Sequence, residues 1–225
     1  GGIEIAADLG VHLEDHEGDV ATETVAELAA INARVLNLAA AQSADITARL
    51  EEVGVRVVSG TGRFTSPSTV TVETDAGSED IEADVVLVST GATPRVLPTA
   101  QPDGERILTW QQIYALPDVP ERLVVVGSGV TGAEFVSAFT ELGVEVTMVA
   151  SGDQILPHED SDAARVLENV LDERGVHLVK RGRCKAVEYT DNGIKVILND
   201  GREVEGSHAL MTVGSVPNTR GLGLD

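Results

Sequence analysis

The residues with the clearest chemical potential are Gly127, Gly129 and Gly132, spaced G-x-G-x-x-G in the stretch LVVVGSGVTGAEF. Residues 123–126 before them predict a short buried strand, and residues 130–142 after them predict a helix. In such a unit the first glycine allows a tight turn, the second lets a pyrophosphate approach the backbone, and the third lets the helix pack against the strand. The helix amides would then face the phosphates. The pattern predicts a dinucleotide site at Gly127, Ser128, Gly129, Val130, Thr131 and Gly132.

The residue that distinguishes NAD from NADP is expected at the end of the next strand, about 20 residues further on. An acidic residue there binds the ribose hydroxyls of NAD, whereas a nearby arginine accommodates the extra phosphate of NADP. The stretch VEVTMVASGD places Ala150 and Ser151 at this point, so neither residue type is present. Like-charge repulsion from the carboxylates that follow would disfavour a second phosphate. The pattern favours NADH and leaves use of both coenzymes open. Those carboxylates are Asp153, Glu159, Asp160 and Asp162.

An internal repeat indicates the elements that must position this turn. Residues 81–94 read IEADVVLVSTGATP and residues 204–217 read VEGSHALMTVGSVP. Each contains an acid, an apolar strand, a glycine and a proline three residues later, and each follows two strands joined by a turn. Upstream, residues 50–63 parallel residues 171–183. The chain therefore holds two copies of one plan: helix, short strand, hairpin, buried strand and glycine turn.

Only the second copy carries the glycine fingerprint, so the front half of the first copy is expected upstream of residue 1. In its place the alanine-rich residues 20–52 predict one long or two consecutive helices with a scaffold role. Residues 107–116, ILTWQQIYAL, predict a short helix.

The predicted fold class is α/β, with two related Rossmann-like nucleotide-binding domains in three layers. The first domain is incomplete, and the second is a parallel sheet with a β-hairpin crossover. Residues 1–97 form the first domain and residues 98–121 a crossing segment. Residues 122–217 form the second domain, and residues 218–225 return to the first.

Composition narrows the function classes. A net charge of −21 would repel nucleic acid and anionic membranes. No apolar run approaches the roughly 20 residues that would span a bilayer. The single cysteine, Cys184, excludes an intramolecular disulfide and favours a reducing, cytoplasmic setting. The five histidines share no ligand spacing, so no metal site is predicted.

The G-x-G-x-x-G-x-E turn, the TGATP strand end and the closing VGSVPN together resemble the FAD-dependent pyridine nucleotide–disulfide oxidoreductases. The resemblance covers essentially the whole chain. The stretches AAAQSADITARL and QPDGERILTW look similar to the dihydrolipoamide-dehydrogenase-like NAD(P)H:quinone reductases of actinobacteria, a branch that lacks the redox disulfide. The resemblance implies FAD and NAD(P)H as cofactors, and a homodimer in the full-length parent.

The resemblance also implies roles for single residues. Gly62 would meet the adenine side of FAD, and Glu134 would lie beside the nicotinamide where hydride crosses to the flavin. Cys184 would line the adenine pocket, and Gly214 would lie near the nicotinamide. Ala150 replaces the acid of NAD-type members. The turn that passes the flavin nucleotide would consist of Thr90, Gly91 and Ala92.

The implied function is hydride transfer from NAD(P)H to FAD and onward to a quinone-like acceptor. One alternative is a dihydrolipoamide dehydrogenase or another disulfide reductase, with a C-x-x-x-x-C pair upstream of residue 1. An alternative of another class is a binding module for nicotinamide dinucleotides that has no catalysis. Without the resemblance, Glu134 would be interpreted as a helix-dipole residue and Cys184 as a small buried hydrophobe. The chain alone is expected to hold little FAD and to bind NAD(P) weakly.

Overall fold

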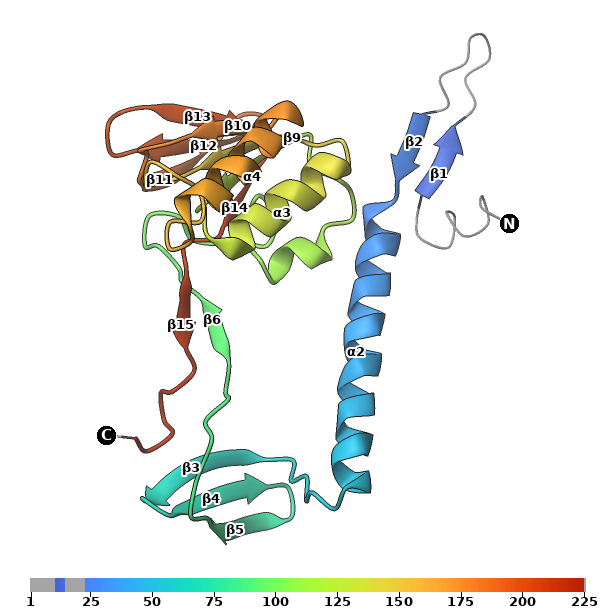
Figure 1. Cartoon of the computed structure of the whole chain (residues 1–225), viewed down its shortest axis with the longest axis vertical. Coiled ribbons are helices and arrows are strands. Elements are labelled where there is room, and N and C mark those ends of the chain that lie inside the picture. Colours follow the sequence, from blue (N-terminus) through green and yellow to red (C-terminus); the bar gives the residue numbers. More distant parts are fainter. Residues whose placement is uncertain (1–10, 15–22, 225) are drawn as a thin grey trace. The chain divides into compact units, whose positions relative to one another are not determined.

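The computed structural model describes residues 11–14 and 23–224. The chain divides into two compact units (Figure 1). Unit 1 comprises residues 1–35 and 94–214, and unit 2 comprises residues 36–93 and 215–225. No helix in the described part of the chain is both long enough and apolar enough to cross a membrane.

Unit 1 is built on a five-stranded sheet in which every neighbouring pair is parallel. Leu210 illustrates the register, since it lies opposite Val125 on one side and Leu108 on the other. Parallel neighbours need long crossovers. Two helices and a three-stranded antiparallel sheet supply them here (Figure 1). In spatial order the strands are β10 (His177–Val179), β9 (Glu145–Val149), β8 (Arg122–Val126), β14 (His208–Met211) and β7 (Ile107–Thr109).

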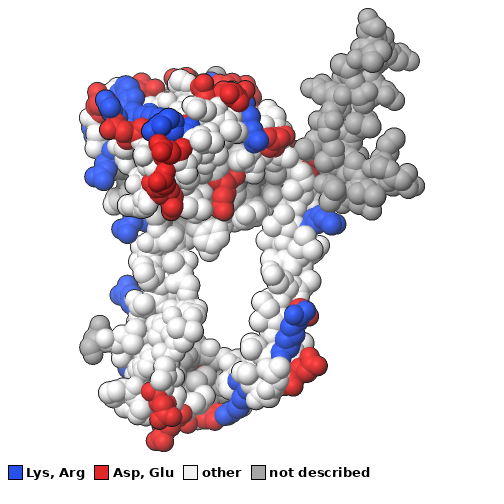
Figure 2. Space-filling view, viewed as in Figure 1, with Lys and Arg blue, Asp and Glu red and all other residues white. Residues whose placement is uncertain are grey.

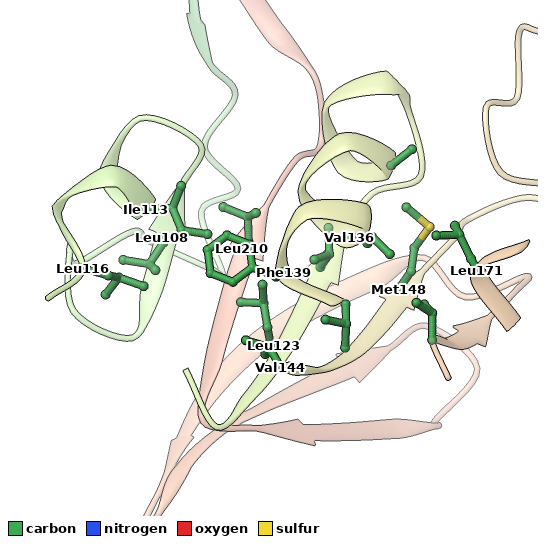
Figure 3. Close-up of a cluster of buried hydrophobic side chains, with 14 of the residues drawn as sticks. Leu108, Ile113, Leu116, Leu123, Val136, Phe139, Val144, Met148, Leu171 and Leu210 are labelled. Atoms are coloured by element: carbon green, nitrogen blue, oxygen red, sulfur yellow. The ribbon is translucent and has the colours of Figure 1, made fainter. Parts of the chain in front are cut away.

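Both faces of this sheet are covered, which gives the predicted three layers. Along β8, Leu123 and Val125 join one core cluster, and Val124 and Val126 join the other. The alternation follows from the two-residue period of a strand. Helices α3 (Val130–Glu141) and α4 (Ser161–Glu173) pack on the first face, as Figure 3 shows for Val136, Phe139 and Leu171. The second face carries the antiparallel strands β11 (Cys184–Thr190), β12 (Gly193–Leu198) and β13 (Glu203–Gly206).

The prediction of a helix over residues 107–116 was wrong for the first half of that segment. Residues Ile107–Thr109 form the edge strand β7, and only Gln112–Ala115 form a short 3-10 helix, η1. Ile107 and Leu108 are fully buried against β14. A short apolar run reads alike as helix or strand until its neighbours are known. The segment predicted as a crossing therefore contributes a strand to the sheet of unit 1.

The alanine-rich stretch forms one helix, α2 (Leu28–Glu52), rather than two. It begins later than predicted, because Glu23–Ala26 form strand β2, which pairs antiparallel with β1 (Val11–Glu14). The middle of α2, residues 35–44, carries no charge and is white in Figure 2.

In unit 2 an antiparallel sheet of β3 (Thr61–Ser66), β4 (Thr69–Thr74) and β5 (Gly77–Glu82) follows. Strands β6 (Ala92–Pro94) and β15 (Ser215–Pro217) pair separately.

The helix and the antiparallel strands of the predicted repeat occur in both copies, but its short strand and its buried strand form only in the second copy. Helices α2 and α4 end in the same way, with left-handed glycines at Gly54 (φ +84°) and Gly175 (φ +85°). The next amide in each copy bonds back to a leucine carbonyl, at 2.9 Å for Val55 to Leu50 and 3.0 Å for Val176 to Leu171. The copies differ at the buried strand. Strand β14 has neighbours on both sides, whereas its counterpart, residues 85–88, forms no strand.

Candidate nucleotide-binding site

The glycine turn follows β8 at the carboxyl edge of the parallel sheet. Gly127 has φ +119°, and a Cβ added there would lie 2.3 Å from the carbonyl oxygen of Thr212. A Cβ at Gly132 would lie 2.2 Å from the carbonyl oxygen of Gly127. Both glycines are therefore required for internal packing of turn, helix and neighbouring strand.

Gly129 differs from these two glycines. It caps helix α3 with an extended backbone (φ −74°, ψ −176°), and a Cβ added there would have no atom within 4 Å. As a glycine, Gly129 has no side chain that could cap the first amides of α3. The turn is thus closed at Gly127 and Gly132 and open at Gly129, on the side where the positive end of the helix dipole lies. This cradle fits a pyrophosphate, which the amides of residues 130–132 would hold.

Thr212 is a supporting residue that the sequence did not reveal as functional. Its hydroxyl donates to the carbonyls of Val126 at 3.0 Å and Gly127 at 3.2 Å, and so fixes the turn from the adjacent strand end. The repeat contained a signal, because Thr212 aligns with Ser89 of the first copy and both carry hydroxyls. Ser128 is buried, and its carbonyl accepts the amide of Leu156 at 2.6 Å.

Glu134 lies on the second turn of α3 and is exposed, as are Val130 and Thr131 at the start of the helix. Among the described residues its carboxylate has no ion-pair partner. A carboxylate near a helix start gains from the dipole. The position is compatible with a group that faces the bound coenzyme, and that role remains a prediction.

The end of β9 departs from the sequence expectation. Ala150 is buried and Ser151 exposed, as a residue at the strand end would be. However, the expectation that no arginine lies nearby was wrong. The guanidinium of Arg181, after β10, forms an ion pair with the carboxylate of Asp153. The two residues are 28 apart in sequence, so only the parallel pairing of β9 and β10 reveals the contact.

Cys184 begins β11 and is half-buried. Its thiol lies 3.6 Å from the carbonyl oxygen of Ala186 and packs against the second core cluster. Burial raises the pKa of this thiol, so it stays protonated near neutral pH. The geometry fits a packing residue, and its predicted role beside adenine remains a prediction.

The residues predicted to meet FAD lie in unit 2. Thr90 donates its hydroxyl to the carbonyl of Asn218 at 2.7 Å, and the Asn218 side chain donates back to the Thr90 carbonyl at 3.1 Å. Gly91 has φ +72° and bonds to the Asn218 amide, and Ala92, which begins β6, is exposed. This fixed turn leaves the backbone accessible and fits contact with a flavin nucleotide.

Two further predicted glycines have structural reasons of their own. A Cβ at Gly62 would lie 3.3 Å from a methyl group of Val70, so its smallness serves packing within the β3–β4 pair. Gly214, in unit 1, has φ +97°, and its carbonyl accepts the amide of Arg95 at 2.9 Å.

An open pocket of about 480 Å³ is lined by residues 177–180 and 202–205. No cluster of metal-ligating side chains occurs within residues 11–14 and 23–224.

Comparison with known protein families shows to which family the chain belongs. The family model described as pyridine nucleotide-disulphide oxidoreductase matches residues 11–225. The chain belongs to this family. Its resemblance to this family, inferred from the glycine turn and the closing VGSVPN, is thereby confirmed.

Several members of the pyridine nucleotide-disulphide oxidoreductase family are similar to this chain. It is 55% identical to an NAD(P)H dehydrogenase (quinone) of Mycobacterium tuberculosis over 98% of this chain and 45% of that protein. It is 32% identical to a dihydrolipoyl dehydrogenase of Zymomonas mobilis over 88% of this chain and 44% of that protein. The chain thus spans less than half the length of these relatives.

Solved structures support the same fold. The crystal structure of LpdA from Mycobacterium tuberculosis matches with a TM-score of 0.80 at 58% identity, over 88% of this chain and 45% of that one. RclA from Escherichia coli, an HOCl-induced flavoprotein disulfide reductase, matches with a TM-score of 0.72 at 22% identity, over 85% of this chain and 44% of that one. At that identity the likeness concerns the fold alone.

Proposed function

We propose that the protein to which this chain belongs is an FAD-dependent oxidoreductase that takes hydride from NAD(P)H and passes electrons to a quinone-like acceptor. The observation that carries this proposal is the glycine turn, closed by packing at Gly127 and Gly132 and open at Gly129. When bound, FAD would accept hydride from the nicotinamide and deliver electrons onward.

The chain itself contributes binding and orientation. The α3 amides hold the pyrophosphate, Ala150 and Ser151 face the adenosine ribose, and Glu134 and Gly214 lie beside the nicotinamide. Unit 2 supplies Gly62 and the Thr90–Ala92 turn to the flavin nucleotide. In this assignment residues 122–217 are the NAD(P) domain, and residues 1–97 with 218–225 are the rear part of the FAD domain. Residues 98–121 lead from the first domain to the second and contribute β7 to the sheet of unit 1.

The quinone-like acceptor is favoured over a disulfide by the 55% identity to an NAD(P)H dehydrogenase (quinone), against 32% to a dihydrolipoyl dehydrogenase. A disulfide reductase is the second candidate, because dihydrolipoyl dehydrogenases recur among the relatives, as in Bacillus subtilis at 35% identity. A non-catalytic nicotinamide module is less well supported, since it would leave the Thr90–Ala92 turn without a purpose. We further propose a cytoplasmic homodimer.

Acceptor choice can be measured directly. The FAD-loaded protein is assayed with NADH and NADPH against a simple benzoquinone and, separately, against lipoamide. We expect turnover with the quinone to exceed turnover with lipoamide by about tenfold or more. Strong lipoamide turnover without quinone turnover would make the protein a disulfide reductase instead.

A further inference from the structure

The loop after β10 is held tightly against the end of β9. The amide of Arg181 donates to the carbonyl of Gly152 at 3.0 Å, and the amide of Gly182 donates to that of Ala150 at 2.9 Å. The side chain of Arg202 supports the same loop by donating to the carbonyls of Lys180 and Arg181, both at 2.9 Å. The root of the Arg181 side chain is therefore fixed beside Ala150, where a Rossmann-type sheet places the adenosine ribose.

A buried carboxylate ties the same region to α4. Glu168 accepts the amide of Ile155 at 2.9 Å and the ammonium of Lys180 at 2.5 Å. The Glu168 side chain is only 12% exposed, so this contact is partly shielded from solvent. The Lys180 ammonium is thereby engaged by Glu168, whereas the Arg181 side chain faces water.

The ion pair between Arg181 and Asp153 is the opposite case. The two side chains are 80% and 71% exposed. An exposed ion pair of this kind is weak, so a competing dianion can displace the aspartate. A phosphate binds a guanidinium by charge-assisted, often paired hydrogen bonds. The Arg181 guanidinium is thus suited to bind a phosphate, and the Asp153 carboxylate, which it holds only weakly, takes the place of that phosphate.

The carboxylates around Arg181 repel a bound phosphate less than the sequence alone indicated. The Asp160 carboxylate accepts the amides of Asp162 and Ala163 at the start of α4, at 2.8 and 3.2 Å. Asp162 forms an ion pair with Arg165 at 3.1 Å. Asp160 and Asp162 therefore keep N–H or positive partners when a phosphate binds Arg181, whereas Asp153 loses its partner in that exchange. Glu159 is the fourth and is exposed to screening solvent.

From this arrangement we propose that Arg181 determines coenzyme specificity by binding the 2′-phosphate of NADP(H), and that Asp153 replaces that phosphate when NAD(H) is bound. The exchange lets one site accept both coenzymes, with the phosphorylated form favoured. The proposal rests on the nucleotide site of the proposed function.

The test measures the affinity of the full chain for 2′,5′-ADP and for 5′-ADP by isothermal titration calorimetry. The first probe carries the 2′-phosphate and the second lacks it, so their affinity ratio isolates that group. Arg181→Asn is the informative variant, because Arg181 has φ +55° and asparagine tolerates this conformation. We expect the ratio to favour 2′,5′-ADP in the wild type and to fall roughly tenfold in Arg181→Asn.

Two more variants sharpen the result. Asp153→Asn frees Arg181 and removes a like charge, so the ratio should rise severalfold. Arg174→Ala is the matched control, because Arg174 follows the last residue of α4 and pairs at 2.7 Å with Glu141, the last residue of α3. Its ratio should equal that of the wild type.

The outcomes separate the two proposals. Binding of 5′-ADP with an unchanged ratio in Arg181→Asn overturns the role of Arg181 and leaves the nucleotide site intact. Failure of both probes to bind overturns the nucleotide site, and the role of Arg181 with it.

Discussion

At the scale of single residues, the three glycines of the turn have different reasons to be glycine. Gly127 and Gly132 lie against backbone carbonyls, whereas Gly129 faces open space. The sequence spacing predicted the turn but not this division, because the division depends on Thr212, which lies 80 positions or more downstream and directly follows β14. Arg181 escaped prediction for the same reason, since its position depends on the pairing of β9 and β10.

Gly129→Ala should separate binding from stability. The added methyl group meets no protein atom, so the free energy of unfolding should change by less than about 1 kcal/mol, the cost of a poorer N-cap. The methyl group fills the space for the pyrophosphate, and the affinity for NADH and NADPH should fall about tenfold or more. Coenzyme titration and urea unfolding measure the two quantities.

Gly132→Ala is the matched comparison. Its methyl group would overlap the Gly127 carbonyl, so this variant should lose about 2 kcal/mol or more of stability. Equal destabilisation in both variants, or unchanged coenzyme affinity in Gly129→Ala, would contradict the geometry assigned to the turn.

At the scale of elements, a small polar network links the start of β8 to the start of β14. The buried Ser207 hydroxyl donates to the Arg122 carbonyl at 2.8 Å and accepts the Arg122 amide at 3.0 Å. Its oxygen also lies 2.9 Å from Nδ1 of His208, the first residue of β14. Burial and then the positive charge of Arg106 lower the pKa of His208, while the charge of Asp103 opposes them.

This shift predicts a pH dependence of stability. Since the pKa of His208 is lowered in the folded chain, the unfolded chain binds a proton more readily near its ordinary value of about 6.5. The contribution to stability is therefore full above that value and is lost as pH falls below it. Urea unfolding should show that the free energy of unfolding falls less between about pH 7.5 and about pH 5.5 in His208→Gln than in the wild type.

The control for this pH effect is His158→Gln, which replaces an exposed histidine in the loop before α4. It should keep the pH dependence of the wild type. A wild-type pH dependence in His208→Gln would mean that other groups govern stability in this range.

Helices and strands were predicted correctly from the sequence where the apolar periodicity of a segment matches the contacts that the segment makes in the fold. The parallel sheet, its hairpin crossover and a helical alanine-rich stretch followed from apolar periodicity and from the repeat, which left open whether that stretch forms one helix or two. The edge strand β7 did not, because Ile107–Thr109 is too short for its period to be read and becomes a strand only beside β14. Strands β1 and β2 were not predicted either.

At the scale of the whole molecule, the two repeats reach different degrees of burial. Ala209 and Leu210 in β14 are fully buried, but Val85 and Leu87 in the corresponding stretch are each 87% exposed. An apolar strand costs about 25 cal/mol for each Å² left in water. This contrast supports the proposal that unit 2 is part of a larger FAD domain, as does the match to less than half the length of the relatives.

The central claim is that this chain helps to carry electrons from NAD(P)H to a flavin and on to an acceptor. It is tested most directly by an anaerobic titration of the FAD-loaded protein with NADH and with NADPH, followed by the visible absorbance of the flavin. We expect the absorbance to fall on addition of either coenzyme and to recover when a simple benzoquinone is added. A flavin absorbance that neither coenzyme changes would contradict the account.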